Sequence, residues 1–202
     1  MPEELKKEFS DDELVEAVRK GYTEDFSVLV KRYGRKIFHF VKRMTADADE
    51  AESITQEVFT NVFAHLNRYT CQGNFQAFIF RAAKNTTLNH LNRQKRTVFF
   101  SRLVKSAESF TVRDNRCQNE DPSEILARKE SQDMVTAALK RLRETQRLAL
   151  ILKVYLDLSY KEIADITGWS TSKIETLISR AKTALKKDIL LQEMPSSDVK
   201  KE

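Results

Sequence analysis

Apolar residues recur at intervals of three and four along most of the chain, which is the spacing of one buried helix face. The sustained two-residue alternation typical of strands is absent from the sequence. The pattern therefore predicts an all-α protein. The segments expected to be helical are residues 11–21, 24–44, 47–66, 74–96, 123–141, 145–156, 160–167 and 171–191.

The helical pattern is interrupted once over a long distance, at the polar segment from Ser106 to Asp121. Loss of periodicity together with polar composition is typical of a connecting segment. We therefore expect two small helical domains, residues 1–105 and 122–192, joined by a flexible linker at 106–121. Residues 193–202 are expected to form a disordered tail.

Helix-capping residues mark several of the predicted helix starts. Ser10 begins a capping box, Thr23 is expected to cap the next helix, and Asp47 and Asp49 are expected to begin the helix after that. Near the C-terminus, Ser159 forms a second capping box with Glu162, and Gly168 stands where a helix end favours a left-handed residue. A short helix, a tight turn and a longer helix form the helix-turn-helix plan, in which the second helix enters the DNA major groove.

The second helix of this motif has a polar outer side. A basic amphipathic hairpin is common, and such a side is often only solvated, but hydroxyls and cations can also contact phosphates and base edges. The predicted DNA contacts of this helix and its cap are Ser170, Thr171, Ser172, Lys173, Glu175, Thr176, Ser179, Arg180 and Lys182.

A second basic region extends from Arg68 to Ala107 and contains no aspartate or glutamate. Phenylalanine, tyrosine, asparagine and glutamine are interleaved with its cations. Cations follow a phosphate backbone, aromatic rings stack on unpaired bases, and amides hydrogen-bond base edges. Some of these phenylalanines are equally expected in a core. The helix before this region instead has a polar ridge at Glu50, Ser53, Gln56 and Glu57, suited either to the helix dipole or to a basic partner.

Charge, cysteine content and the absence of catalytic motifs limit the classes of function that the sequence allows. The net charge is +5, which favours an anionic partner only weakly, so the distribution of charge matters more. Cys71 and Cys117 are expected to be free thiols, although a redox role stays open. The three histidines lie far apart, and no nucleophile motif or phosphate-binding loop is present, so we expect no enzyme activity, metal or cofactor. Without an apolar leader or span, a cytoplasmic protein is expected.

Two motifs resemble extracytoplasmic-function sigma factors, the small alternative specificity subunits of bacterial RNA polymerase. The stretch from Asp49 to Arg96 is similar to the family's second conserved region, with matches at Gln56, Glu57, Phe80 and Arg81, among others. The stretch from Leu158 to Lys187 is similar to its fourth region. The two motifs occur in the family's order, and together the resemblance covers residues 14–96 and 133–187.

The resemblance implies roles for individual positions. The partners would be the largest and second-largest subunits of core RNA polymerase, promoter DNA and an anti-sigma factor. Core polymerase would bind Glu50, Glu52, Ile54, Gln56, Glu57 and Phe59. The melted minus-ten strand would bind the loop 69–74 and the following helix, through Tyr69, Asn74, Phe75, Arg81, Lys84, Asn85, Asn89, Asn92, Arg93 and Arg96. The helix-turn-helix residues given above would read the minus-thirty-five duplex.

One departure from the family pattern concerns the recognition helix, where Glu175, Thr176 and Leu177 replace lysine, serine and arginine. A carboxylate beside phosphates weakens binding, although it can accept a hydrogen bond from cytosine N4. We therefore expect an unusual minus-thirty-five preference. The alternative function is a stand-alone helix-turn-helix regulator whose N-terminal helices serve dimerisation or signal reception. Helices with that role would not need the basic stretch from Arg68 to Ala107, which contains no acid.

Overall fold

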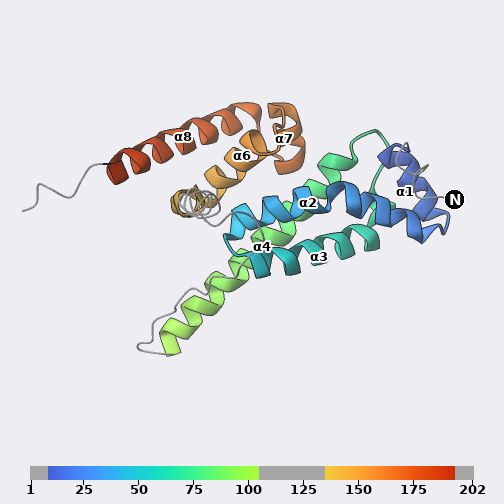
Figure 1. The fold of residues 1–202 in the computed structure, drawn as a ribbon, viewed down its shortest axis with the longest axis horizontal. Coiled ribbons are helices and arrows are strands. Elements are labelled where there is room, and N and C mark those ends of the chain that lie inside the picture. The colour runs from blue at the N-terminus through green and yellow to red at the C-terminus, as the bar shows by residue number, and fades with distance from the viewer. Residues whose placement is uncertain (1–8, 105–134, 194–202) are drawn as a thin grey trace, which may run out of the picture. The chain divides into compact units, whose positions relative to one another are not determined.

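The computed structural model describes residues 9–104 and 135–193, and all regular structure in these two ranges is helical. The chain divides into two compact units, an N-terminal unit that contains α1 to α4 and a C-terminal unit that contains α6 to α8 (Figure 1). The predicted all-α fold in two domains is confirmed. The predicted linker, the predicted helix start at residue 123 and residues 194–202 of the predicted tail lie outside the described residues, whereas Glu193 is helical.

The N-terminal unit is built from four helices and two short 3-10 turns. Its elements are α1 (Asp11–Arg19), η2 (Thr23–Asp25), α2 (Phe26–Thr45), α3 (Ala48–Ala64), η3 (Leu66–Arg68) and α4 (Phe75–Val104). Helices α2, α3 and α4 pack against one another (Figure 1). Helix α4 continues beyond Arg96, the end predicted from the apolar pattern, because no glycine or proline interrupts the sequence there.

The helix starts predicted at Ser10 and at Asp47 are confirmed. Ser10 and Glu13 form a complete capping box, and the Asp47 carboxylate accepts the backbone N–H of Glu50 at 2.9 Å. Thr23 was expected to cap α2, and that prediction is wrong. Thr23 opens a 3-10 turn instead, and the residue before α2 is Asp25, which makes no capping hydrogen bond through its side chain.

Aromatic rings fill the core of the N-terminal unit. Phe40 and Phe80 lie edge to face with ring centres 5.8 Å apart, and Phe75 lies 5.5 Å from Tyr33. Edge-to-face pairs add to the burial energy of large side chains. Phe63, four residues after the buried Phe59 of α3, continues the helical spacing of apolar residues but is 44% exposed beside Phe26.

The C-terminal unit has an aliphatic core. Residues 135–141 are helical, followed by α6 (Glu144–Val154), α7 (Tyr160–Thr167) and α8 (Thr171–Glu193). Helices α6 and α8 pack against each other, with Ile151 and Ile174 fully buried. The guanidinium of Arg147 is buried and donates to the carbonyls of Lys140 and Leu142, at 3.3 and 3.4 Å. These carbonyls lie at the C-terminal end of the helix at residues 135–141, where they have no partner within that helix.

The capping box of α7 gives a stability prediction. Replacing Ser159 with alanine should lower the free energy of unfolding of the C-terminal unit by about 1 kcal/mol. The Ser159 backbone N–H and hydroxyl donate to the Glu162 carboxylate and lower the pKa of that carboxyl. This contribution is present above the unfolded-state pKa and is lost as the pH falls through the folded-state pKa, so the difference from wild type should shrink in acid.

Urea unfolding followed by the fluorescence of Trp169, the one tryptophan, measures this difference. Ser179→Ala is the matched control, because Ser179 is exposed within α8, and its effect should stay within about 0.5 kcal/mol. A difference for Ser159→Ala that does not change between neutral and acid pH would contradict the contribution assigned to Glu162.

Candidate nucleic-acid interface

The turn between α7 and α8 sets the direction of the longer helix. Gly168 has φ +76°, a left-handed conformation that glycine adopts without steric penalty, and its N–H donates to the Ala164 carbonyl at 2.7 Å. Two residues later, the Ser170 hydroxyl accepts the backbone N–H of Lys173 at 3.3 Å and caps α8. The chain therefore folds here as the predicted helix-turn-helix.

In the part of α8 whose side-chain burial is described, residues 171–188, the fully buried side chains and the predicted contact residues lie on different sides. Ile174, Ile178 and Ala181 are at most 4% exposed. All the predicted minus-thirty-five contacts are exposed, namely Ser170, Thr171, Ser172, Lys173, Glu175, Thr176, Ser179, Arg180 and Lys182. None of them is needed for the core, so the whole face is available to a partner.

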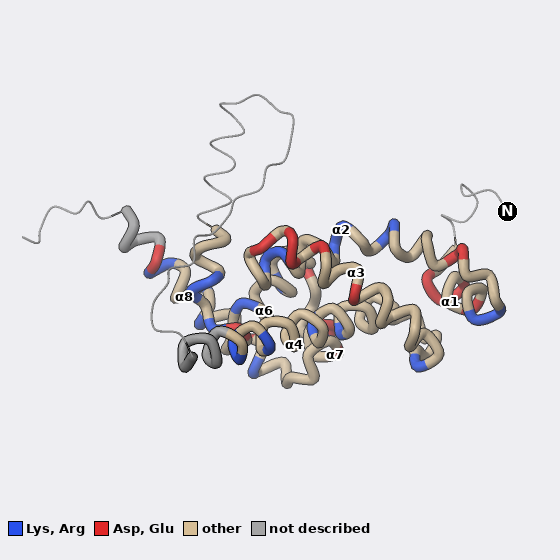
Figure 2. Tube along the Cα trace, turned by 90° about the horizontal axis from the view of Figure 1, so that it is seen from below, with Lys and Arg blue, Asp and Glu red and all other residues tan. Residues whose placement is uncertain are grey.

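Charge on this face is mostly positive. Figure 2 shows blue basic positions along α8, which include the exposed Lys173, Arg180 and Lys182. The ammonium of Lys173 lies 5.0 Å from the centre of the Trp169 ring, a cation–π contact that restricts where this cation can point. Glu175 is exposed among these cations and lowers the net charge of the face.

The predicted minus-ten residues fall into two groups. The exposed group consists of Asn74, Arg81, Asn85, Asn89, Asn92, Arg93 and Arg96. Tyr69 and Phe75 are instead 5% and 1% exposed, with ring centres 5.4 Å apart, and Lys84 is half-buried. Rings this deep in the core offer no face to a base in this conformation, so they support the loop rather than form its surface.

The predicted polymerase-binding residues of α3 also divide. Glu52, Gln56 and Glu57 share the exposed side of the helix, whereas Ile54 and Phe59 are buried and hold α3 on the core. Glu50 is half-buried and faces α4, where it accepts a hydrogen bond from the Gln94 amide and lies 3.8 Å from the His90 ring nitrogen. The surface open to a partner is therefore smaller than the sequence ridge suggested.

Two polar residues of α1 to which the sequence analysis assigned no functional role lie against the loop Tyr69–Asn74. Asp12 accepts the Tyr69 hydroxyl, and Arg19 donates to backbone carbonyls at the loop start. Burial and the neighbouring Asp12 carboxylate raise the pKa of Tyr69 to about 12, so its hydroxyl keeps its proton at neutral pH. No local pattern in the sequence indicates these contacts, because the partners are about fifty residues apart.

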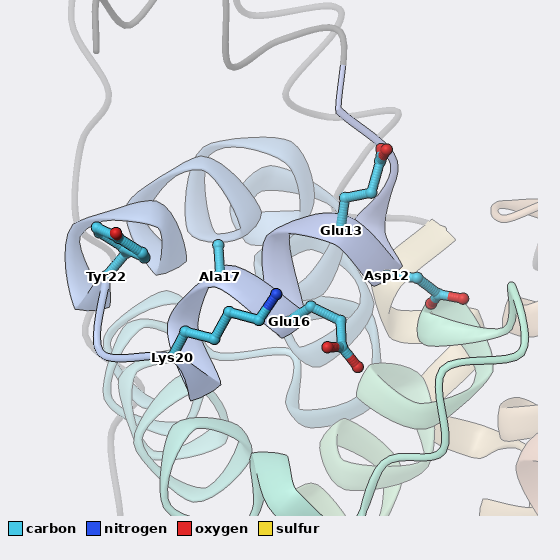
Figure 3. Close-up of a pocket in the computed structure, with 6 residues that line it drawn as sticks. All are labelled: Asp12, Glu13, Glu16, Ala17, Lys20 and Tyr22. Carbon is cyan, nitrogen blue, oxygen red and sulfur yellow. The ribbon is translucent and has the colours of Figure 1, made fainter.

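Figure 3 shows an open groove along α1, lined by charged and aromatic side chains. Its lining residues are Asp12, Glu13, Glu16, Ala17, Lys20 and Tyr22. The side chains of Lys20 and Tyr22 are exposed to solvent. Asp12 lies at the end of this groove, and its carboxylate points away from Tyr22, toward the ribbon that follows α3 (Figure 3).

Comparison with known proteins identifies the family. Residues 29–97 match the family model of sigma-70 region 2, and residues 132–185 match that of sigma-70 region 4. The RNA polymerase sigma-H factor of Pseudomonas aeruginosa is 31% identical over 88% of this chain and 92% of its own length. The ECF RNA polymerase sigma-E factor of Escherichia coli K12 is 29% identical over 90% of this chain and 95% of its own length. The chain belongs to the extracytoplasmic-function sigma factors.

Solved structures share the fold of this sigma factor. A structure of CnrH with the cytosolic domain of CnrY matches with a TM-score of 0.66 and 19% identity, over 91% of this chain and 99% of that one. The sigma factor RpoE with the anti-sigma factor NepR from Bartonella quintana matches with a TM-score of 0.63 and 23% identity, over 85% and 99%.

The protein is thus an alternative sigma factor, which directs transcription initiation by RNA polymerase. Within the described ranges, no three His, Cys, Asp or Glu side chains come together in a way that could hold a metal ion. No helix in those same ranges has the length and apolar character needed to cross a membrane.

Proposed function

We propose that the two units of this sigma factor divide the promoter between them. The exposed face of α8 reads the minus-thirty-five duplex, and the loop Tyr69–Asn74 with the exposed side of α4 takes the melted minus-ten strand. The observation that carries this assignment is that α8 has a buried aliphatic stripe and a different side on which every predicted contact residue is exposed.

The assignment of the minus-ten strand to α4 rests on chemistry and exposure. Four exposed amides or guanidiniums, Asn85, Asn89, Asn92 and Arg93, follow one another at intervals of one, three or four residues along the helix. Spacings of three and four bring side chains onto one side of a helix. Amides can hydrogen-bond exposed base edges while the cations contact phosphates, and neither requires a paired duplex.

Core polymerase docks, in this proposal, on the exposed side of α3 through Glu52, Gln56 and Glu57. Their carboxylates and amide suit a basic surface on the largest subunit, with the second-largest subunit as a further contact of the chain. Buried Ile54 and Phe59 act only by seating the helix. The chain works where polymerase works, in the cytoplasm. An anti-sigma factor as regulator is supported by RpoE of Bartonella quintana, which has the same fold and was solved with the anti-sigma factor NepR.

Run-off transcription from genomic fragments tests this division of the promoter. Bacterial core polymerase should produce discrete new start sites only when the protein is added, and the aligned upstream sequences should show two conserved elements. A minus-thirty-five element whose sequence preference does not respond to any substitution on the exposed face of α8 would contradict the assignment of that face.

Substitution of Glu175 is expected to raise DNA affinity, whereas most substitutions in a binding face lower it. Glu175→Lys should tighten binding to the minus-thirty-five duplex, because a cation replaces a carboxylate on an exposed face that meets phosphates. The slope of log affinity against log salt should steepen by about one unit, as for one added phosphate contact. Fluorescence anisotropy with a labelled duplex measures both quantities.

Glu175→Gln is the matched control, since it removes the negative charge without adding a cation. It should give an intermediate affinity. If Glu175→Lys leaves duplex affinity and its salt dependence unchanged, Glu175 does not lie near DNA and the unusual minus-thirty-five preference has another origin.

A further inference from the structure

The loop between η3 and α4 is held at both ends by one carboxylate of α1. The Asp12 carboxylate accepts the Tyr69 hydroxyl at 2.5 Å and the Gly73 backbone N–H at 2.7 Å, using a different oxygen for each. The Tyr69 hydroxyl in turn accepts the backbone N–H of Asn74 at 3.1 Å. One side chain therefore fixes the distance between the first and the last residues of the loop.

Arg19, two turns further along α1, holds the start of the same loop. Its guanidinium donates to the Leu66 carbonyl at 2.8 Å and also to the Tyr69 carbonyl, and it lies 3.4 Å from the Cys71 sulfur. Glu16 lies 3.6 Å from the same guanidinium. The Arg19 side chain is only 23% exposed, so these contacts form in a partly desolvated place where hydrogen bonds to a cation are strong.

These hydrogen bonds satisfy backbone groups of the connection between η3 and α4, which is too short to form regular structure of its own. Buried backbone N–H and carbonyl groups need partners, and here α1 supplies them across 47 to 61 residues of sequence. Gly73 has φ +70°, which lets the chain turn so that its N–H meets Asp12. In contrast, Thr70, Gln72 and Asn74 are exposed. The loop is thus fixed through its backbone and open through its side chains.

We propose that Asp12 and Arg19 are positioning residues that hold the loop Tyr69–Asn74 ready to receive one unpaired promoter base. This inference rests on the proposed role of the loop in minus-ten recognition. A loop that is already ordered loses less conformational entropy on binding, and it presents its amides in one geometry, which raises discrimination between bases. Neither residue needs to touch DNA.

Conservative substitutions separate positioning from folding. Asp12→Asn keeps the shape of the side chain, but an amide has one acceptor oxygen and an NH2 group that faces a donor, so it cannot accept both the Tyr69 hydroxyl and the Gly73 N–H. Arg19→Met keeps the aliphatic packing and removes the donors to the Leu66 and Tyr69 carbonyls. Lys20→Met is its control, because Lys20 is exposed on the same helix.

Asp11→Asn is the matched control for Asp12→Asn. Asp11 is the neighbouring carboxylate of α1, and it also bonds a tyrosine and an arginine, but these are Tyr33 and Arg32 of α2. Its replacement weakens the attachment of α1 to α2 and leaves the bonds from Asp12 and Arg19 to the loop in place. Gln72→Ala and Asn74→Ala test the exposed side chains of the loop itself.

The experiment is run-off transcription by the reconstituted holoenzyme from two template libraries, one randomised over the minus-ten element and one over the minus-thirty-five element, with sequencing of the products. Wild type should show a preference of about tenfold at the position read by the loop. Asp12→Asn and Arg19→Met should reduce that preference to about threefold or less at this position, with the minus-thirty-five preference unchanged. Asp11→Asn and Lys20→Met should retain the wild-type profile.

The other possible outcomes would contradict either the role of the loop or the positioning role of Asp12 and Arg19. If Gln72→Ala and Asn74→Ala leave the minus-ten preference intact, the proposed role of the loop is wrong, and the positioning role fails with it. If those loop variants flatten the preference but Asp12→Asn and Arg19→Met do not, only the positioning role fails. If Asp11→Asn flattens it as much as Asp12→Asn, the effect comes from general loosening of α1, which also overturns the proposal.

Discussion

Reversing the charge of Glu52 and Glu57 together, by replacing both with lysine, is expected to abolish transcription from the promoters of this sigma factor. The two carboxylates are exposed on the same side of α3 and have no role in its core. Each reversal should cost about 2 kcal/mol of binding free energy to core polymerase, which is about a thirtyfold loss of affinity. Co-elution with core polymerase and a competition assay for polymerase measure the loss.

Glu24→Lys is the control for a single charge reversal, because Glu24 is exposed in η2 and does not belong to the proposed docking side of α3. It should leave polymerase binding within about threefold of wild type, since surface charges away from an interface contribute little. Helical content and thermal unfolding of the double variant should match those of wild type. Normal polymerase affinity in a folded double variant would place the docking surface elsewhere on the chain.

Neutralising Lys173, Arg180 and Lys182 as glutamine is expected to remove most of the duplex affinity of the C-terminal unit. Each exposed cation that meets a phosphate releases a counterion, so the slope of log affinity against log salt should fall by about three units. Affinity at moderate salt should fall by about tenfold or more. Anisotropy titrations with the minus-thirty-five duplex at several salt concentrations measure both quantities.

Lys140, Lys161 and Lys186 provide a control set of equal charge, since all three are exposed on the C-terminal unit and none belongs to the predicted contact face. Glutamine at these positions should change the salt slope by less than one unit. Equal losses for the two sets would mean that the unit attracts DNA by its overall charge and not through the face of α8.

The helix-turn-helix was predictable from sequence because every signal that defines it is local. The Ser159 capping box, the left-handed Gly168 and the Ser170 cap each depend on residues at most four positions apart, and all three form as predicted. The stripe of α8 follows from its 3.6-residue period, although Leu185, expected in the core, is only half-buried. Local hydrogen bonds and periodicity together determine this part of the fold.

The site was less predictable from sequence where an aromatic ring can serve either the core or a base, or where the partner of a side chain is far away in the sequence. Tyr69 and Phe75 looked suited to stacking on bases, but their rings complete an aromatic core and the Tyr69 hydroxyl bonds to α1. Glu50 belonged to an apparently continuous polar ridge, yet it faces α4. Asp12 and Arg19 gave no functional signal, because a first-turn acid and a last-turn base are ordinary helix features.

The separation of α8 into two faces that share no residue has a consequence for divergence among sigma factors. Substitutions on its outer side leave Ile174, Ile178 and Ala181 untouched, so that side can acquire a new DNA preference while the unit keeps its stability. The loop of the N-terminal unit lacks this freedom, because its backbone depends on residues of α1. Among descendants of this protein, recognition of the minus-thirty-five element should therefore diverge sooner than recognition of the minus-ten element.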